Sequence, residues 1–537
     1  MSQRWVHTLL LVLMSSSPLL AKKFYWDDPL PQEPKLVNLG EVKVRKLGNY
    51  YDYVYYSLAT PGELNTKQQV VRSKAVNSLG EPMNGAWYTH RHYWHPMSLE
   101  ELAQGVGGTT PPSTDGPWSV VSAKTQGVTA GFTMMDAKKR RYFVKFDSLS
   151  NPEMATAADM ISGRFFHALG YHVYDSYLVY FDRKQLVVAP QVDVFDKGKK
   201  SRMTERDLDG FLLKIPKTKD GRFRALVTLE LPGKNVGPFL FHGTRWDDVN
   251  DSVPHEHRRD LRGYYVFCAW LNHNDSRAQN TLDMVVEESS ARFVRHHLID
   301  FGATLGSATT RADSPRAGGE YLFAWGPALK EIASLGLWVP PWAGARYPYY
   351  RSVGRFEAEV FDPDQWYPEF PNPAFLNRLP DDEFWAAKQV MAFTDDDIRA
   401  VVKTGQISEP AAEEYLVNCL IQRRDKIGRT FFAKVLPLDF FAVQHGELVF
   451  EDLAKEHGMG ATGPLRVSWY GFDNETEQKT LLAGQGGFAI PLNETPSSDP
   501  VYYAADISRE ADTRRTVTVY LRIQRGQPEV VGIERSW

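Results

Sequence analysis

HNDSRAQN, residues 273–280, and DFG, residues 300–302, are the two stretches of this 537-residue sequence that decide its fold. The segment before them, 258–272, has the length and apolar content of a helix. Between them, 281–286 and 293–299 are apolar runs on either side of a polar turn, which predicts the two strands of a hairpin. The expected order is therefore helix, polar loop, hairpin and turn.

The hairpin predicts that Asn280 and Asp300 are neighbours. An antiparallel pair returns the chain to the point where it began, so Asp300 is expected beside Asn280. Phosphoryl transfer requires carboxylate and amide ligands for Mg²⁺, and a group that orients the attacking oxygen. We therefore predict that Asn280 and Asp300 bind Mg²⁺. Residues 273–280 have the HxDxxxxN spacing of protein kinases, in which the aspartate acts on the nucleophile, so Asp275 is the predicted catalytic residue.

A lysine upstream supplies the cation that phosphates require. The strand-like run 142–147 reads YFVKFD and places Lys145 among apolar residues, where a charge is costly unless it meets a partner. The next segment, 151–170, is predicted to be a helix that opens with Asn-Pro and stops at a glycine. Asp159 on this helix is the predicted partner of Lys145, with Glu153 as the alternative. Lys145 would then reach the α- and β-phosphates of a nucleotide.

Two glycines precede this lysine in a segment predicted to be a loop between strands. Gly127 and Gly131 lie just before the apolar run 132–135, which with 118–123 and 142–146 predicts a small antiparallel sheet. Because glycine lets backbone N–H groups approach phosphate closely, we predict that Gly127 and Gly131 contribute to nucleotide binding.

Together these motifs resemble the atypical branch of the protein-kinase-like superfamily, which includes HipA-like kinases and the secreted CotH-like kinases. The resemblance covers about residues 118–438. It implies a two-lobed fold that holds ATP between the lobes, with Lys145 and Asp159 as the ion pair of the first lobe, Asp275 as the catalytic aspartate, and Asn280 and Asp300 as Mg²⁺ ligands.

The sequence also departs from the pattern of protein kinases. It has no GxGxxG motif and no Ala-Pro-Glu triplet after Gly302, and 304–319 is rich in loop-forming residues where an activation segment would lie. The acceptor of the phosphoryl group is therefore not implied by the resemblance. A hydroxyl-bearing protein, glycan or small molecule remains open.

The predicted fold class is α+β, with a two-lobed kinase-like domain between two further regions. Strand-like alternation, clearest in 516–523, predicts a β-sandwich-like domain at the C-terminal end, which is a candidate surface for a cell-envelope partner. The predicted boundaries are a signal peptide at 1–21, an N-terminal extension at 22–117, an N-lobe at about 118–190, a C-lobe at about 191–438, and the β domain at 439–537.

Composition excludes some classes of partner. The chain carries 62 basic and 66 acidic residues, for a net charge of −4, and has no long run of either sign, so nucleic acid is not expected. The two cysteines, Cys268 and Cys419, are far apart and indicate neither a disulfide framework nor a metal cluster. The short apolar run near the start, followed by Ala21, predicts export to the periplasm or the exterior, with an uncleaved membrane anchor as the alternative.

Two alternatives accompany the kinase-like interpretation. HRHYWH, residues 90–95, contains ligand-like histidines that could bind a transition metal, but the interleaved aromatic residues favour packing. The second alternative concerns function. Because an exported protein has no obvious supply of ATP, the chain could be an inactive pseudokinase that serves as a binding or scaffold protein of the cell envelope.

Overall fold

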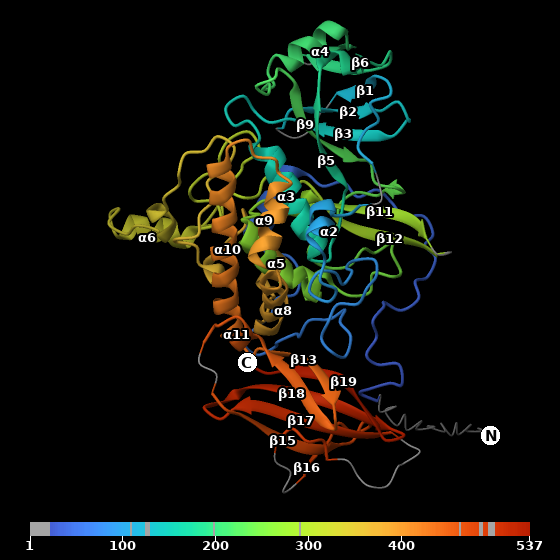
Figure 1. Cartoon of the computed structure of the whole chain (residues 1–537), viewed down its shortest axis with the longest axis vertical. Coiled ribbons are helices and arrows are strands. Elements are labelled where there is room, and N and C mark those ends of the chain that lie inside the picture. The colour runs from blue at the N-terminus through green and yellow to red at the C-terminus, as the bar shows by residue number, and fades with distance from the viewer. Residues whose placement is uncertain are drawn as a thin grey trace, which may run out of the picture.

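The chain folds into three stacked parts in this computed structural model (Figure 1). A sheet lies at one end, a mainly helical lobe in the middle, and an antiparallel β domain at the other end. The predicted α+β class, the two lobes and the C-terminal β domain are confirmed. The predicted signal peptide lies outside the described residues. The structure describes 22–107, 110–123, 129–196, 199–288, 291–460, 463–482, 487–491 and 500–537.

The N-lobe is built on a sheet with the strand order β5-β9-β3-β2-β1-β6. All neighbouring strands in it are antiparallel except β1 and β6, which are parallel. Strand β9 completes the sheet between β5 and β3, so the N-lobe extends past the predicted boundary near residue 190. The strands are β1 (Trp118–Ala123), β2 (Gly131–Met135), β3 (Arg141–Lys145), β5 (Ser176–Phe181), β6 (Leu186–Val188) and β9 (Phe223–Leu229).

A small cap covers the core of this sheet. Helix α4 (Glu205–Leu212) buries Leu208 and Leu212 against the sheet residues Val120, Met134 and Val144. The hairpin of β7 (Asp193–Asp196) and β8 (Lys199–Arg202) lies between β6 and α4 in the chain. The N-lobe therefore has an apolar core of its own.

Helix α3 (Met154–Ala168) connects the two lobes and is buried along almost its whole length. It begins later than the predicted start at Asn151, because Glu153 at its N-cap has a left-handed backbone with a φ of 70°. On its inner side, Ile161 and Phe165 belong to the core of the C-lobe rather than to the core of the sheet. The helix thus fixes Asp159 between the lobes.

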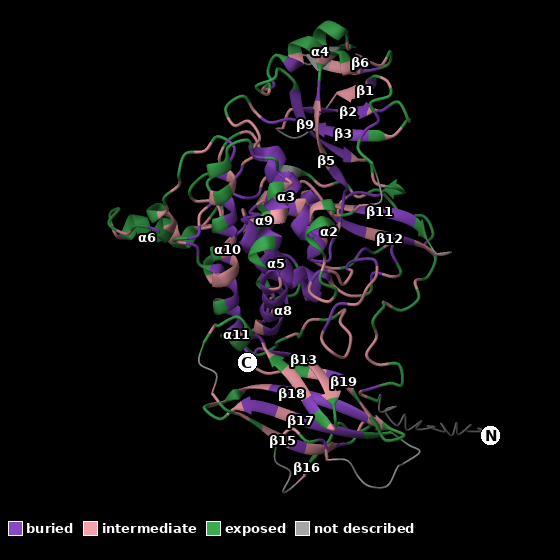
Figure 2. Cartoon of the chain, in the orientation of Figure 1, coloured by how far each residue is buried: buried purple, intermediate pink, exposed green. Residues whose placement is uncertain are grey.

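The C-lobe is organised around α5 (Arg259–Leu271), every residue of which is buried. Trp270 Nε1 in this helix donates a hydrogen bond to the Leu420 carbonyl oxygen, 3.0 Å away. Figure 2 shows the buried residues concentrated along these central helices. The other elements are β4 (His172–Val173), β10 (Lys234–Asn235), β11 (Thr281–Glu288), β12 (Ala291–Leu298), α7 (Pro373–Leu376), α8 (Pro380–Met391), α9 (Asp395–Lys403) and α10 (Pro410–Phe432), together with the 3-10 turns η2 (His255–His257) and η3 (Ala278–Asn280). The 3-10 turn η1 (Arg183–Gln185) lies between β5 and β6 in the N-lobe.

The predicted hairpin is present, with Thr281 of β11 opposite Leu298 of β12. After it, the chain from residue 303 to residue 372 is mostly irregular, as the loop-forming composition predicted. It contains the outlying helix α6 (Trp325–Ala333), which has no buried residue, and the 3-10 turns η4 (Pro341–Gly344) and η5 (Pro363–Gln365) (Figure 1).

The N-terminal extension packs along the rest of the chain rather than forming a separate core. Its helices are α1 (Asn49–Ala59) and α2 (Leu99–Gln104). Val42 joins an apolar cluster with Val285 and Val294 of the hairpin, and Phe24 packs in the β domain with its ring centroid 5.1 Å from that of Tyr520. The extension therefore ties the C-lobe to the β domain.

The C-terminal domain has an antiparallel sheet with the order β16-β15-β17-β18-β19 and a hairpin, β13-β14. Leu438 and Leu448 from the hairpin share a core with Trp469 and Val519 of the sheet, which gives the predicted sandwich-like packing. Among the described residues, no helix combines the length and apolar character needed to cross a bilayer. The elements are β13 (Leu438–Gln444), β14 (Glu447–Asp452), α11 (Leu453–Glu456), β15 (Leu465–Phe472), β16 (Lys479–Leu481), β17 (Val501–Arg509), β18 (Asp512–Gln524) and β19 (Gln527–Arg535).

Candidate active site

Lys145 joins the N-lobe sheet to two carboxylates from different elements. Its Nζ atom lies 2.8 Å from Asp159 Oδ2 in α3 and 2.7 Å from Asp300 Oδ1 in the DFG turn. Burial alone would lower the pKa of Lys145, but the two carboxylates outweigh it and raise that pKa well above its usual value. Lys145 is therefore a fixed positive charge at the point where the lobes meet.

Tyr174 contacts both of the residues that bind Lys145 and was not predicted from the sequence. Its hydroxyl donates to Asp159 Oδ1 at 2.6 Å and accepts from the Asp300 backbone N–H at 3.0 Å. Burial, and then the charge of Asp159, raise the pKa of Tyr174 well above its usual value, so it stays a neutral donor. No motif marks this residue, since it is one of several tyrosines in an apolar run.

The alternative partner of Lys145 is occupied elsewhere. Glu153 Oε2 accepts a hydrogen bond from the Ser408 backbone N–H at 2.8 Å, just before α10 begins. Glu153 therefore ties the start of α3 to the C-lobe. Asp159 is the helix acid that contacts Lys145.

The hairpin brings Asn280 and Asp300 to the same end of the C-lobe. The Ile299 N–H donates to the Asn280 carbonyl oxygen at 3.0 Å, which places Asp300 next in line. Asp300 has a φ of 61°, a left-handed conformation that is uncommon outside glycine and often found at functional sites. Its side chain is 48% exposed, so its carboxylate is open to a ligand.

These two residues have the donor chemistry of a Mg²⁺ site. Asn280 uses its Nδ2 to donate to the Asp275 carbonyl oxygen at 2.7 Å, and no described residue donates a hydrogen bond to its Oδ1. An amide oxygen and a half-exposed carboxylate are hard oxygen donors of the kind that Mg²⁺ prefers. The residues present therefore fit this metal.

Asp275 lies in a small network of charged side chains. Its Oδ1 is 2.6 Å from Arg277 Nε, and its side chain is 16% exposed. Glu369, which no sequence pattern marks, also approaches this arginine, with its Oε2 3.7 Å from Arg277 Nη1. The Glu369 N–H also donates to the Asn274 carbonyl oxygen at 2.8 Å, which binds this segment to the loop.

Two carboxyl groups in this network favour a shared proton. Burial raises the pKa of Asp275. Burial, together with the neighbouring Asp275 carboxylate and a hydrogen bond to it, raises the pKa of Glu369 to about 8. The pair therefore holds a proton to a higher pH than two separate carboxyl groups would. An aspartate with a raised pKa is better suited to accept a proton from a hydroxyl group.

The first histidine of the loop has a packing role. His273 is fully buried beside Phe301 of the DFG turn, with ring centroids 6.0 Å apart, and burial lowers its pKa to about 4. Phe301 also stacks on Phe166 of α3, with centroids 4.9 Å apart. These neutral rings fix the loop, the turn and α3 in one arrangement.

Only one of the two predicted nucleotide-binding glycines can be placed. Gly131 begins β2 and lies directly opposite Lys145 in the antiparallel pair. Gly127 lies outside the described residues. Of the predicted site residues, the structure therefore gathers Lys145, Asp159 and Asp300, with Gly131 opposite the lysine and Asn280 and Asp275 along the adjoining loop.

Known proteins offer only distant similarity. No family model matches the chain, and no curated protein matches it. Among solved structures, a proinflammatory kinase of Helicobacter pylori, CtkA, is 10% identical and covers 59% of this chain and 98% of its own, with a TM-score of 0.32. A Golgi casein kinase with Mn/ADP bound is 10% identical and covers 63% of this chain and 74% of its own, with a TM-score of 0.30. At these TM-scores, the function of this chain has to be inferred from its own side chains.

The histidines of residues 90–95 have packing roles, as their interleaved aromatic neighbours predicted. His90 Nε2 hydrogen-bonds the Pro82 carbonyl oxygen at 2.6 Å, and His92 Nδ1 accepts from the Met97 N–H at 3.1 Å. Within the described ranges, no three His, Cys, Asp or Glu side chains gather as a metal site. The mixed amide and carboxylate pair of Asn280 and Asp300 is a different kind of site.

Changing Glu369 to Gln should remove one source of pH dependence from the stability of the fold. The pKa of Glu369 is about 8 in the folded protein, against a usual value of 4.5. Between these two pH values the folded chain retains a proton that the unfolded chain releases, so this group makes the wild type less stable as pH rises from about 4.5 to about 8. The variant lacks this contribution.

Melting temperatures of the wild type and Glu369→Gln, followed by circular dichroism from about pH 5 to about pH 9, would test this. We expect the wild type to lose stability relative to the variant across that range. The exposed Glu331 in α6 gives a matched control, because Glu331→Gln should leave the wild-type pH profile unchanged. A constant difference between wild type and Glu369→Gln at every pH would contradict the raised pKa.

Proposed function

We propose that this chain is an Mg-ATP-dependent phosphotransferase that acts on a hydroxyl acceptor. The observation that carries the proposal is the contact of Lys145 Nζ with both Asp159 and Asp300, at the end of the hairpin that also presents Asn280. A phosphotransferase requires a cation for the phosphates, oxygen ligands for a metal, and a base near the nucleophile. Asp275 supplies the base.

Each residue has one task in this proposal. Lys145, oriented by Asp159, binds the α- and β-phosphates, while Asn280 and Asp300 hold Mg²⁺, which neutralises charge on the phosphates when bound. The acceptor oxygen forms a bond to the γ-phosphorus as the bond from that phosphorus to the β,γ-bridging oxygen breaks. The hydroxyl proton passes to Asp275, and ADP leaves with the bonding electron pair.

Asp300→Ala tests the metal assignment. Removing this carboxylate should lower the affinity for ATP in the presence of Mg²⁺ by at least about tenfold, because a primary metal ligand is lost. Isothermal calorimetry would measure this with ATP and Mg²⁺, and again with a chelator. Asp396→Ala, which removes an exposed carboxylate from α9, is the matched control and should bind like the wild type. Equal Mg-ATP affinity in the wild type and Asp300→Ala would refute the assignment.

A measurement of phosphoryl transfer separates the alternative function, that of a pseudokinase, from this one. Mg-ATP binding without transfer to any acceptor would indicate a pseudokinase that serves as a binding or scaffold protein. Export, predicted from residues 1–21, and a cell-envelope partner for the β domain stay predictions. The N-terminal mass of the natively produced protein would decide the first of these.

A further inference from the structure

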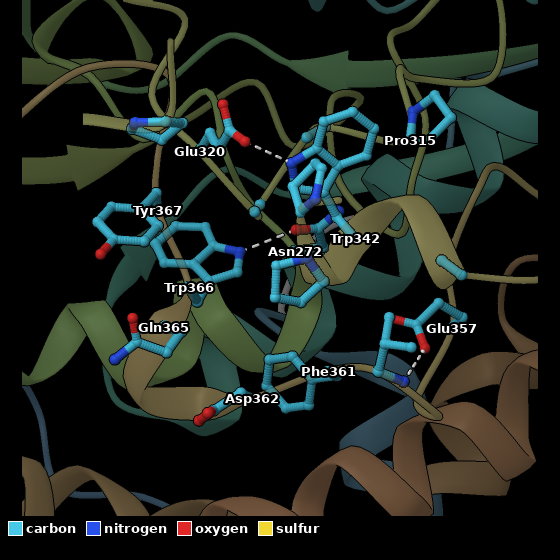
Figure 3. Close-up of a pocket in the computed structure, with 18 of the residues that line it drawn as sticks. Asn272, Pro315, Glu320, Trp342, Glu357, Phe361, Asp362, Gln365, Trp366 and Tyr367 are labelled. Carbon is cyan, nitrogen blue, oxygen red and sulfur yellow. Dashed lines mark hydrogen bonds between the residues drawn. The ribbon is translucent and has the colours of Figure 1, made fainter. Parts of the chain in front are cut away.

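A cavity of about 620 Å³ lies beside the catalytic loop, in the irregular region that follows the DFG turn (Figure 3). One wall is formed by residues 315–347, which include part of α6, and the other by residues 355–367. Its volume falls in the range of pockets that enclose small ligands. The proposed nucleotide contacts do not use it.

The position of the cavity relative to Asp275 suits an acceptor. Asn272, which lines it, accepts a hydrogen bond on Oδ1 from Trp366 Nε1 at 2.8 Å (Figure 3). Two residues separate Asn272 from Asp275 in the chain, so their Cα atoms are at most about 11 Å apart. The irregular segment that carries Trp366 continues to Glu369, whose side chain lies beside Arg277 and Asp275. The cavity therefore adjoins the loop that carries the proposed base.

The charge of the lining argues against a strongly ionic ligand. Three acidic and three basic side chains line the cavity, so their formal charges cancel. Most are already engaged. Glu320 accepts from Trp342 Nε1 at 2.6 Å and lies 3.2 Å from Arg316, while Arg423 donates to three backbone carbonyl groups. The lining as a whole therefore offers neither a polyanion nor a polycation an excess of opposite charge.

The neutral groups of the lining favour a hydroxyl-rich ring. Trp338, Trp342 and Tyr347 supply aromatic surface, and Gln365 is exposed on the opposite wall. Among the described residues, none hydrogen-bonds to the Gln365 side chain, the Trp338 indole N–H or the Tyr347 hydroxyl. A sugar ring presents an apolar C–H face to aromatic rings and hydroxyl groups at its edge to amide, indole and phenol groups.

We infer that this cavity binds the acceptor of the phosphoryl group and that the acceptor is a carbohydrate. The inference rests on the proposed function for the transfer step, in which a sugar hydroxyl attacks the γ-phosphorus of ATP, its proton passes to Asp275 and ADP departs. Binding of the sugar requires none of these steps. It can be measured separately.

The test is a glycan array probed with the labelled full chain, followed by calorimetry with the best-bound oligosaccharide. Trp342→Ala removes a half-buried ring and Gln365→Ala an exposed amide, so both variants should fold. We expect each to weaken binding at least tenfold. Trp246→Ala removes an exposed tryptophan elsewhere and serves as the matched control, and it should bind like the wild type.

Transfer is then measured with ATP and the bound oligosaccharide. Phosphate on the sugar, lost in Trp342→Ala, supports the inference. Sugar binding that depends on Trp342, without transfer, supports the cavity as a carbohydrate site and counts against the proposed function. No array binding by the wild type, or binding unchanged in both variants, overturns the inference. Phosphorylation of a peptide library at equal rates by wild type and Trp342→Ala also overturns it, while leaving the phosphotransferase proposal standing.

Discussion

Asp275→Asn should lower the rate of phosphoryl transfer by at least about 100-fold while leaving Mg-ATP binding near that of the wild type. The amide has almost the same shape as the carboxylate, so the network with Arg277 and the backbone contact from Asn280 to residue 275 should persist. The amide cannot accept the proton of an acceptor hydroxyl. Nucleotide binding depends on groups outside this residue, namely Lys145, Asn280 and Asp300.

Single-turnover transfer and calorimetric Mg-ATP affinity should be measured on the same preparations. Asp313→Asn is the matched control. Asp313 lies outside the loop of Asp275, but its Oδ2 accepts a hydrogen bond at 2.9 Å from Asn274 Nδ2, which is in that loop. That variant makes the same chemical change next to Asp275 and should lose far less activity. Equal transfer by Asp275→Asn and the wild type would remove Asp275 from the mechanism. Equal losses in both variants would show that the loop as a whole is sensitive.

The parts of the site that the sequence predicted are set by local geometry. Asp300 follows a hairpin whose two strands pair along their whole length, so its place beside Asn280 follows from the chain returning on itself. Lys145 and Asp159 are close in sequence, at the end of a strand and in the helix that follows it. In both cases one supersecondary unit fixes the contact, and apolar periodicity and turn residues reveal such units.

The parts that were missed depend on packing between distant segments. Glu369 reaches the loop only because the irregular chain after the DFG turn folds back along it, and no periodic pattern marks that path. Strand β9 follows a hairpin and a helix in the chain, yet it inserts between β5 and β3. The sequence pattern did not reveal this pairing, so the predicted end of the N-lobe was too early in the chain. Tyr174 carries a hydroxyl into a buried network, but its neighbours in sequence look like any apolar run.

The pair of Lys145 and Asp159 should behave as one unit in a double-mutant cycle. Lys145→Ala should reduce transfer by roughly 10²–10³-fold, because a positioned charge on the phosphates is lost. Asp159→Asn should reduce transfer less, because Asp300 still contacts Lys145 and Tyr174 can still contact residue 159. The double variant should lose little beyond Lys145→Ala alone, because removing one member of a pair already removes the function of the other.

The same four proteins can also be compared by stability. For stability, unlike transfer, the second substitution should partly restore what the first one removes. Asp159 is 1% exposed, so Lys145→Ala leaves its carboxylate buried without its cation and should cost about 3–5 kcal/mol in the free energy of unfolding. Adding Asp159→Asn removes that uncompensated charge, and the double variant should regain part of the loss. Chemical denaturation of the four proteins measures this. Additive losses in both transfer and stability would mean that Asp159 acts elsewhere. Because Glu153 is bound to Ser408, Asp300 would then be the acid that orients Lys145.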